Sequence, residues 1–314
     1  YNNSTFTAPI SVFGGRVVIP SGSGNVTLQP PLALSNAPAT FQPDGGDNLW
    51  VTNVISGPVG IVVDATTGGG LELGGDNTFD GPVVVSNGYV TVGRGGTSGS
   101  VRGNISLFNG ATVYLWRDDA LTLSNTISGI GNVYIRNPAG LTIDGRASIN
   151  VSGELRIPWD VAHSSMLIES GAVVTVGNFY VGNQTGWKGS VTQHAGVVTA
   201  TNVMGVGQWL NETSRYVMAG GTLNVTNARL SFGWDGAGHF IQTGGVVNVR
   251  RAQLDSNNST PGASLWIFEG GSFNIRDALD GPGDGADLAL WGGGTVGALG
   301  SWNSMVGFRA ILTG

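Results

Sequence analysis

Between residues 166 and 277 the sequence repeats itself about every 25 residues, with the composition of β-strand and tight turn. Each unit contains an apolar residue, a glycine-rich turn, an alternating strand and a polar corner. A period of this length is typical of stacked units that share one core and depend on their neighbours to bury an apolar face. The second turn position recurs in steps of 24, 25, 24 and 26 residues, at Ala172, Gly196, Gly221, Gly245 and Gly271.

The columns of the repeat predict which side chains face the core. Successive side chains of a strand point to opposite faces, so apolar residues two positions apart share the inner face. The predicted inward positions are Val174, Val198, Leu223, Val247 and Phe273, followed by Val176, Ala200, Val225, Val249 and Ile275. The predicted outward positions between them are Thr175, Thr199, Asn224, Asn248 and Asn274.

A polar corner follows each of these strands. Its residues are largely Asn and Asp, which tolerate the left-handed backbone conformation that we expect a corner to need. A second strand then runs to a glycine, so that one unit holds about three short strands and three corners. The corner positions are Asn178, Asn202, Asn227, Arg251 and Asp277, and the glycines that end the second strand are Gly182, Gly207 and Gly233.

These patterns predict an all-β chain. Residues 83–93 and 111–124 also alternate apolar and polar side chains, and helical periodicity is hard to find. The predicted fold is a right-handed parallel β-helix (β-solenoid) of roughly 12 coils, with about 25 residues per coil. A β-sandwich with coincidental spacing is the alternative, and five in-register repeat cores disfavour it.

Composition agrees with a chain of many sharp turns. The 54 Gly residues stand beside 11% charged residues, but 40% hydrophobic residues and nine Trp argue against disorder. Glycine accepts positive φ without a Cβ clash and therefore marks turns. The chain has no Cys, which excludes disulfides, Cys-ligated zinc and thiol catalysis.

Charge and hydropathy limit which partners the chain can bind and where it is located. The net charge is −6, and Arg250 with Arg251 forms the one adjacent basic pair, so we expect no nucleic-acid binding. No apolar run approaches the roughly 20 residues of a membrane span, so we expect no membrane insertion. The chain opens on Tyr1 rather than Met, which fits either a processed, secreted chain or a chain trimmed at its start. We expect the first, and with it an extracellular or cell-surface location.

The first half carries a more specific pattern. Ile55-Ser56-Gly57 is followed by a glycine-rich stretch and then by Leu71, Leu73, Gly75, Asn77, Thr78, Phe79 and Gly81, and the pattern restarts at Ile127-Ser128-Gly129. This resembles the passenger-associated repeat of autotransporters, and the 25-residue units are similar to the β-helical repeats of secreted bacterial surface proteins. The resemblance covers about 70% of the chain, and it implies a β-helix and a secretion context rather than a reaction.

We expect one β-solenoid domain over residues 1–314. Its predicted parts are an irregular N-terminal part at 1–48, passenger-type repeats at 49–163, regular repeats at 164–287 and a C-terminal strand segment at 288–314. Neither terminus shows a convincing cap, and an open solenoid end exposes unpaired backbone groups. Copies of the chain are therefore the predicted partners, end to end or laterally.

Parallel β-helices also occur in polysaccharide lyases and hydrolases, so paired acids and bases need attention. Stacking of the coils predicts that Glu169 lies close to His194. Asp118 and Asp119 are adjacent in sequence and fit a solvated turn, and the three His have no metal-ligand spacing. An acid–base site also needs a second group and a means of excluding water. The sequence therefore predicts no catalytic and no cofactor-binding residues.

Two further sets of residues are candidates for binding. Asp277, Asp280, Asp284 and Asp287 lie in a Gly-rich segment, a composition that suits calcium, although the segment lacks the EF-hand spacing and reads equally as a polar loop. Trp209 and Trp234 occupy the same place in successive repeats, and Trp187 lies near that register. A row of such rings could bind a partner subunit or a glycan, or each ring could pack over its own corner.

The function that we expect is a non-catalytic extracellular structural protein, a rod that assembles with copies of itself into a fibre or surface coat. The alternatives are a surface adhesin that binds extracellular glycans through the Trp row, or a polysaccharide lyase or hydrolase. Ordered assembly, loss of binding on Trp replacement, and release of reducing ends distinguish the three.

Overall fold

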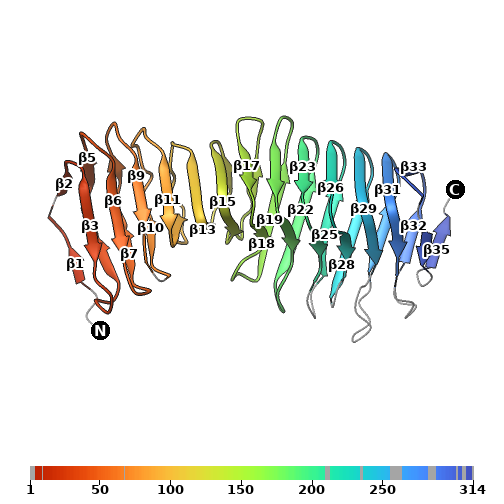
Figure 1. The fold of residues 1–314 in the computed structure, drawn as a ribbon, viewed down its shortest axis with the longest axis horizontal. Helices are drawn as coiled ribbons and strands as arrows, with labels where there is room; N and C mark the ends of the chain where they lie inside the picture. The colour runs from red at the N-terminus through yellow and green to blue at the C-terminus, as the bar shows by residue number, and fades with distance from the viewer. Residues whose placement is uncertain are drawn as a thin grey trace. The chain divides into compact units, whose positions relative to one another are not determined.

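The computed structural model of the chain is built from β-strands, and no helix occurs among the residues that it describes (Figure 1). It describes all residues except 1–3, 9, 67, 209–212, 234–235, 255–263, 282–287, 302, 306–308 and 313–314. Parallel strands stack as a β-solenoid of about 11 coils, about 24 residues apart. The predicted solenoid class is therefore confirmed. No helix in the described chain is long and apolar enough to cross a membrane.

The described chain forms two compact units. The first covers Tyr1–Ala120, Ser124–Asn137 and Ile149–Gly153. The second covers Leu121–Leu123, Pro138–Ser148 and Glu154–Gly314. Each unit buries its own set of apolar side chains between the walls of its coils.

In the first unit each coil contributes short strands to walls of stacked parallel strands. One wall contains β1 (Ser4–Phe6), β4 (Val26–Leu28), β7 (Asn48–Val51), β10 (Gly70–Leu73) and β12 (Tyr89–Val92). A second contains β3 (Gly15–Ile19), β6 (Ala39–Pro43), β9 (Ile61–Asp64) and β11 (Val83–Asn87). A third contains β2 (Ile10–Val12), β5 (Leu32–Leu34) and β8 (Ile55–Ser56). The later strands are β13 (Ile105–Leu115), β15 (Thr126–Ile135) and β17 (Ser148–Val151).

The second unit has three walls. The first contains β14 (Leu121–Leu123), β16 (Leu141–Ile143), β19 (His163–Ile168), β22 (Lys188–Gln193), β25 (Thr213–Met218), β28 (Ala237–Gln242), β30 (Leu265–Phe268), β32 (Leu288–Trp291) and β35 (Arg309–Leu312). The second contains β20 (Val173–Val176), β23 (Val197–Ala200), β26 (Thr222–Val225), β29 (Val246–Leu254), β31 (Ser272–Asp280) and β33 (Thr295–Ala298). The third contains β18 (Glu154–Ile157), β21 (Asn178–Val181), β24 (Met204–Val206), β27 (Leu230–Phe232) and β34 (Asn303–Met305), together with the second halves of β29 and β31.

The N-terminal part at residues 1–48 was predicted as irregular, but its described residues, 4–8 and 10–48, are folded into coils. It contains β1 to β6, and β3 pairs with β6 from Gly15 and Ala39 onward. Phe41 is fully buried between the walls. Pro20 and Ser23 lie in a tight turn between β3 and β4, in which the amide of Ser23 donates to the carbonyl of Pro20 at 3.1 Å.

The inward columns of the repeat lie where the alternation predicts them. All ten predicted inward side chains are buried, each with 0 or 1% of its surface exposed. Their strands stack in parallel register, with Val174 beside Val198 and Leu223 beside Val247. Burial of a Val or Leu side chain contributes about 1.5–3 kcal/mol, so these columns are a principal source of the stability of the stack.

The outward column forms a ladder of side-chain hydrogen bonds. Asn224 Nδ2 donates to Thr199 Oγ1 at 3.4 Å, and Asn248 Nδ2 donates to Asn224 Oδ1 at 3.0 Å. Asn274 Nδ2 continues the ladder to Asn248 Oδ1 at 2.9 Å. We call Thr199, Asn224, Asn248 and Asn274 the asparagine ladder. Because each amide satisfies the next, the ladder fixes the register of successive coils at the surface.

The corner residues do not adopt the left-handed conformation that the sequence suggested. Asn178 begins β21, and its Oδ1 accepts hydrogen bonds from Asn202 Nδ2 at 2.9 Å and from the amide of Val203 at 3.3 Å. The corner is therefore held by side-chain bonds between coils rather than by an unusual backbone. Among the described residues the non-glycine positions with positive φ are Asn36, Asn109 and Asp160.

The glycine turn shifts by one residue in the first regular repeat. Gly196 has a φ of 73°, but its stacked neighbour Ala172 has no positive φ, and Gly171 takes that role with a φ of 80°. The strands still align, because the amide of Val197 donates to the carbonyl of Ala172 at 2.9 Å. A Cβ on Ala172 is therefore tolerated in a column otherwise occupied by glycine.

The passenger-type motif has a structural explanation in the first unit. Asn77 is 2% exposed, and its Oδ1 accepts a hydrogen bond from the amide of Ile55 at 2.9 Å. Its Nδ2 donates to the carbonyls of Gly75 at 2.7 Å and Ser100 at 2.9 Å. Asn77 therefore ties together backbone groups of three coils, and Phe79 beside it is fully buried.

Buried polar side chains also occur inside the second unit. Tyr216 is fully buried, and its hydroxyl donates to Gln193 Oε1 at 2.6 Å. Gln193 Nε2 in turn donates to the carbonyls of Gly196 and Thr222 at 3.2 and 3.0 Å. The next two coils place Met218 and then Gln242 in the same column, so amide and thioether side chains alternate at these three positions.

Candidate functional site

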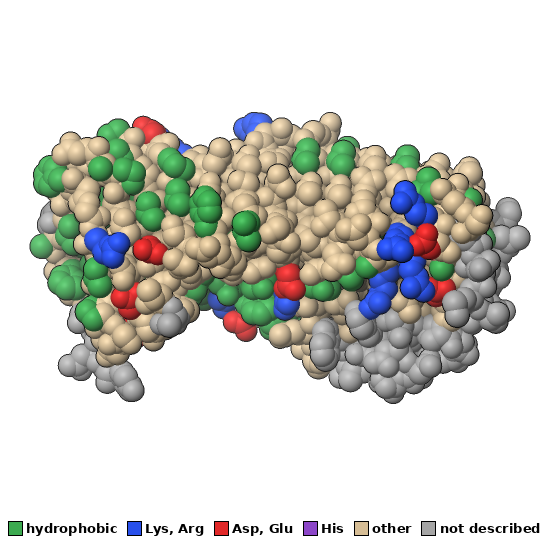
Figure 2. Space-filling view, in the orientation of Figure 1, with side chains coloured by type: hydrophobic (Ala, Val, Ile, Leu, Met, Phe, Trp, Pro, Cys, Tyr) green, Lys and Arg blue, Asp and Glu red, His purple; other side chains and the backbone are tan. Residues whose placement is uncertain are grey.

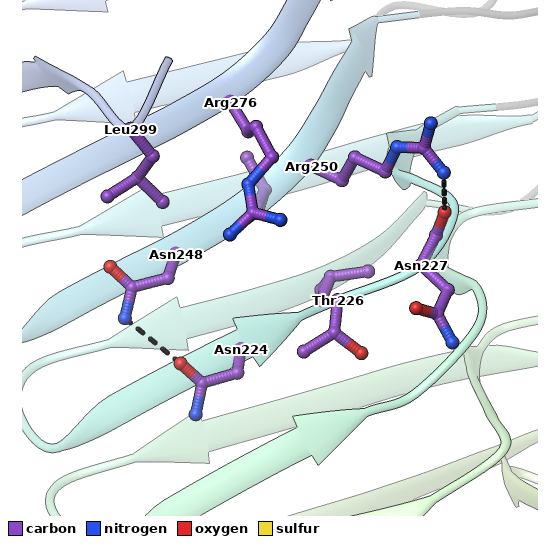
Figure 3. A pocket seen from close by; sticks show the side chains of 9 residues that line it. Asn224, Thr226, Asn227, Asn248, Arg250, Arg276 and Leu299 are labelled. Atoms are coloured by element: carbon purple, nitrogen blue, oxygen red, sulfur yellow. Dashed lines mark hydrogen bonds between the residues drawn. The ribbon is translucent and has the colours of Figure 1, made fainter.

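A groove on the second unit lies where the asparagine ladder meets arginine side chains (Figure 3). Its cavity has a volume of about 210 Å³. Strands β26, β29 and β31 position its polar side chains, because successive coils repeat the same outward positions. Its lining residues are Asn224, Val225, Thr226, Asn227, Asn248, Val249, Arg250, Arg276 and Leu299. We call this feature the amide–arginine groove.

Two arginines give the amide–arginine groove its charge. Arg250 donates from Nη1 to the carbonyl of Asn227 at 2.8 Å and from Nε to the carboxylate of Asp277 at 2.5 Å. The side chain of Arg276 is exposed and makes no hydrogen bond or ion pair with another described residue. The groove therefore presents amide donors and acceptors, a hydroxyl and a cation to a polar ligand. Sequence reasoning missed this groove, although the outward Asn column and the Arg250-Arg251 pair were its visible signals.

More arginines surround this groove. Arg251 Nη2 donates to Asp280 at 2.7 Å, and burial together with the charge of Arg251 lowers the pKa of Arg229. Figure 2 shows a dense patch of Lys and Arg side chains on this part of the molecule. Among the described side chains at this place, four arginines therefore lie beside two aspartates, in a chain with a net charge of −6.

The predicted calcium residues are divided by the structure. Asp277 pairs with Arg250 and Asp280 pairs with Arg251. Asp284 and Asp287 lie outside the described residues. In the described part of the chain no group of three or more His, Cys, Asp or Glu is arranged to hold a metal ion. Calcium binding stays a prediction, and any ion at Asp277 or Asp280 would compete with a guanidinium group.

The predicted Trp row is represented by Trp187. Its ring is partly exposed and packs edge-to-face on Trp159, with 5.8 Å between the ring centroids. The guanidinium of Arg156 lies 5.1 Å from the ring centroid of Trp159. Trp209 and Trp234 lie outside the described residues, so the row itself stays a prediction. Sequence reasoning missed Trp159, which lies outside the repeat register that linked the other rings.

The predicted proximity of Glu169 and His194 is confirmed. Glu169 Oε1 lies 3.1 Å from His194 Nδ1 across neighbouring coils. The side chains are 36% and 52% exposed, so water reaches both. Asp118 is exposed, and Asp119 pairs with Arg117 at 2.7 Å, whose hydrogen bonds hold the pKa of that carboxyl below its usual range. Acid–base chemistry is favoured where water is excluded, whereas the side chains of Glu169 and His194 are open to water.

An outward aromatic surface lines the first unit. Tyr114 packs edge-to-face on Tyr89 and Tyr134, with centroid distances of 5.3 and 5.5 Å. Tyr89 donates its hydroxyl proton to Asn48 Oδ1 at 2.6 Å, and burial raises the pKa of that hydroxyl. These rings are partly exposed and stack coil upon coil. Sequence reasoning missed them, although Tyr alternating with apolar residues was their signal.

Cation–π pairs extend this aromatic surface. The guanidinium of Arg94 lies 3.8 Å from the ring centroid of Trp50, and that of Arg136 lies 3.9 Å from Trp116. Arg94 also donates to Glu72 at 2.6 Å. Rings held in this way are rigid, and partly exposed rigid rings are suited to stacking on apolar sugar faces or on a protein partner.

No protein-family model matches the chain, and no solved structure matches it. The chain is similar to the BmaC autotransporter adhesin of Brucella suis biovar 1, with 36% identity over 124 residues. The match covers 35% of this chain and 4% of that protein. Together with the parallel β-solenoid, this similarity confirms the resemblance to the β-helical passengers of autotransporters.

Proposed function

We propose that this chain is a non-catalytic, surface-located β-solenoid of the adhesin type, in which a rigid core presents outward side chains to a ligand. The similarity to an autotransporter adhesin supports the class of function and an extracellular or cell-surface location. The fold supports it physically, because parallel coils hold successive side chains in fixed columns.

The observation that carries the proposal is the in-register stacking of polar and aromatic side chains on the outer surface. The asparagine ladder, the stacked Tyr89, Tyr114 and Tyr134, and the exposed Arg276 are binding groups rather than proton-transfer groups. The described carboxylates near the amide–arginine groove are engaged by arginines. A binding role therefore fits the described chemistry better than hydrolysis or elimination.

Binding of the purified chain to immobilised extracellular matrix and to glycan arrays tests this function. Saturable binding is expected, and Arg276→Gln should weaken it if the amide–arginine groove contributes. Arg146→Gln is a matched control, because Arg146 is an exposed arginine whose ion pair with Asp144 lies within one turn. Absence of saturable binding to any cell-surface or matrix component would refute the proposal, and release of reducing ends from a polysaccharide would replace it with an enzymatic one.

Assembly of the chain with copies of itself is a second proposed role, end to end or laterally. Its support is a pair of exposed apolar side chains on the first unit, Phe108 at 48% and Ile130 at 63% exposure. They follow the paired residues Leu107 and Gly129, so they lie in neighbouring coils at the same corner. Sedimentation velocity and negative-stain microscopy of the wild-type chain and of Phe108→Ser/Ile130→Ser test this role, and a monomer at high concentration would exclude it.

A further inference from the structure

A second cavity lies on the outer face of β19, β22 and β25, on the first wall of the second unit. Its volume is about 250 Å³. The strand register brings His163 beside Lys188, and Ser165 beside Ser190 and then Arg215. Thr213 adds a further hydroxyl group to the lining. We call this feature the cationic pocket.

The composition of the cationic pocket contrasts with that of the chain. Lys188 is the single lysine in a sequence with a net charge of −6, and it converges here with Arg215 and an imidazole. None of the residues that line the cavity is acidic. The cationic side chains and three hydroxyl groups are complementary to an oxyanion that carries several acceptor atoms.

The hydrogen bonds of the cationic pocket prepare it for such a ligand. Arg215 Nε donates to Ser190 Oγ at 3.0 Å, which orients the guanidinium and leaves its two terminal NH₂ groups without a partner among the described residues. In the buried floor of the pocket the amide of Gly189 donates to Ser214 Oγ at 3.0 Å, so this amide already has a hydrogen-bond partner. Recognition therefore falls to the outer side chains, and a guanidinium presented in this way binds a sulfate or carboxylate through two parallel hydrogen bonds.

The spacing of the coils favours a polymer over a small ion. Lys188 and Arg215 lie in neighbouring coils about 4.8 Å apart, and they are also two residues apart along the strands, because Ser190 is the residue paired with Arg215. Their Cα positions are therefore separated by about 8 Å, so successive anionic groups of one polymer can engage the two cations. Trp187 immediately precedes Lys188, and its partly exposed ring offers an apolar surface next to the charges. An acidic polysaccharide combines anionic groups at regular intervals with apolar ring faces.

We propose that the cationic pocket binds the sulfate or carboxylate groups of an acidic extracellular polysaccharide. This inference rests on the proposed adhesin function and names its class of ligand. Arg215 holds the oxyanion, and His163, Lys188 and the hydroxyl groups of Ser165, Ser190 and Thr213 complete its hydrogen bonds.

The test compares binding of the full chain to dextran sulfate, to polygalacturonate and to neutral dextran by biolayer interferometry. The pocket variant is Lys188→Gln/Arg215→Gln. The control variant is Arg102→Gln/Arg146→Gln, which removes the same net charge from side chains that are 62% and 73% exposed elsewhere. Circular dichroism confirms that each variant folds, as expected for changes confined to exposed side chains.

We expect the wild-type chain to bind one or both acidic polymers and not neutral dextran, and their ratio identifies the anionic group. The pocket variant should lose about tenfold or more in affinity, while the control should change by less than about threefold. Equal affinities of wild type and pocket variant, or an equal loss in the control, would overturn the proposal.

Adhesion of cells that display the chain separates this inference from the proposed function. If the pocket variant leaves adhesion unchanged, the role proposed for the cationic pocket is refuted and the adhesin function still stands. If cells that display the chain do not adhere, but the chain still binds dextran sulfate through the pocket, the adhesin function is refuted and the ligand proposed for the pocket still stands.

Discussion

Replacing Asn77 by Asp tests how the passenger-type motif holds the coils together. The substitution preserves the shape of the side chain and the acceptor for the amide of Ile55. It also places an oxygen where Nδ2 now donates to the carbonyls of Gly75 and Ser100, at 2.7 and 2.9 Å. Two buried donors are thereby replaced by an acceptor that faces two other acceptors.

The magnitude follows from these contacts. Loss of a buried hydrogen bond that leaves its partner unsatisfied costs about 1–3 kcal/mol, so Asn77→Asp should lower the free energy of unfolding by about 2–6 kcal/mol. Burial beside carbonyl oxygens disfavours the charged carboxylate, so the pKa of the new carboxyl is raised in the folded state. A raised folded-state pKa means that the penalty is smallest below the unfolded value near pH 4 and grows as the pH rises.

Urea unfolding followed by Trp fluorescence, at about pH 4 and about pH 8, measures this effect. Asn53→Asp is the matched control, because Asn53 is exposed and its Oδ1 accepts from the amide of Val54, a bond that a carboxylate keeps. The control should change stability by less than about 0.5 kcal/mol. A variant at position 77 that is as stable as the control, or whose penalty grows as the pH falls, would refute the reasoning.

Three other predictions concern stability. Tyr216→Phe leaves buried Gln193 Oε1 without its donor and should cost about 1–3 kcal/mol, and Gln193→Met in the same chain should reduce this cost in a double-mutant cycle of urea midpoints. Gly221→Ala should destabilise the chain far more than Gly186→Ala, although both glycines have positive φ. A Cβ at Gly221 would lie 2.4 Å from a backbone oxygen, whereas a Cβ at Gly186 meets no atom within 4 Å. Equal melting temperatures of the two variants would contradict this prediction. The pKa of Asp119 is lowered in the folded state, so its contribution to the free energy of unfolding is present above the unfolded pKa near 4 and is lost as the pH falls. Asp119→Asn should therefore make the free energy of unfolding depend less steeply on pH in the acid range. An unchanged pH dependence would contradict this prediction.

Calcium binding at the predicted aspartates is tested by calorimetry with millimolar calcium chloride. Arg250 and Arg251 occupy Asp277 and Asp280, so we expect any heat of binding to increase when Arg251 is replaced by Gln. Absence of heat and of thermal stabilisation in both chains would remove the calcium site.

The sequence predicted the interior of this fold better than its surface. Inward columns such as Val174 and Val198 are determined by burial, and burial follows directly from alternation and period. The same register predicted that Glu169 meets His194, because stacking converts one repeat length into one contact. The prediction of a left-handed backbone at the corners was wrong for a local reason. Asn178 satisfies its corner through a side-chain bond to Asn202, and this choice depends on the neighbouring coil rather than on intrinsic backbone preference.

The candidate sites were harder to predict because they lie where the repeat is broken. A ladder such as Asn224 to Asn274 repeats one residue type, and each amide uses part of its hydrogen-bonding capacity on the next. A charged group is added only where the column changes type, as when Ser165 and Ser190 are followed by Arg215. Periodicity identifies the constant columns, and the chemistry arises at the departures from them. A search for function in a β-solenoid should therefore begin with the outward positions at which the residue type changes from one coil to the next.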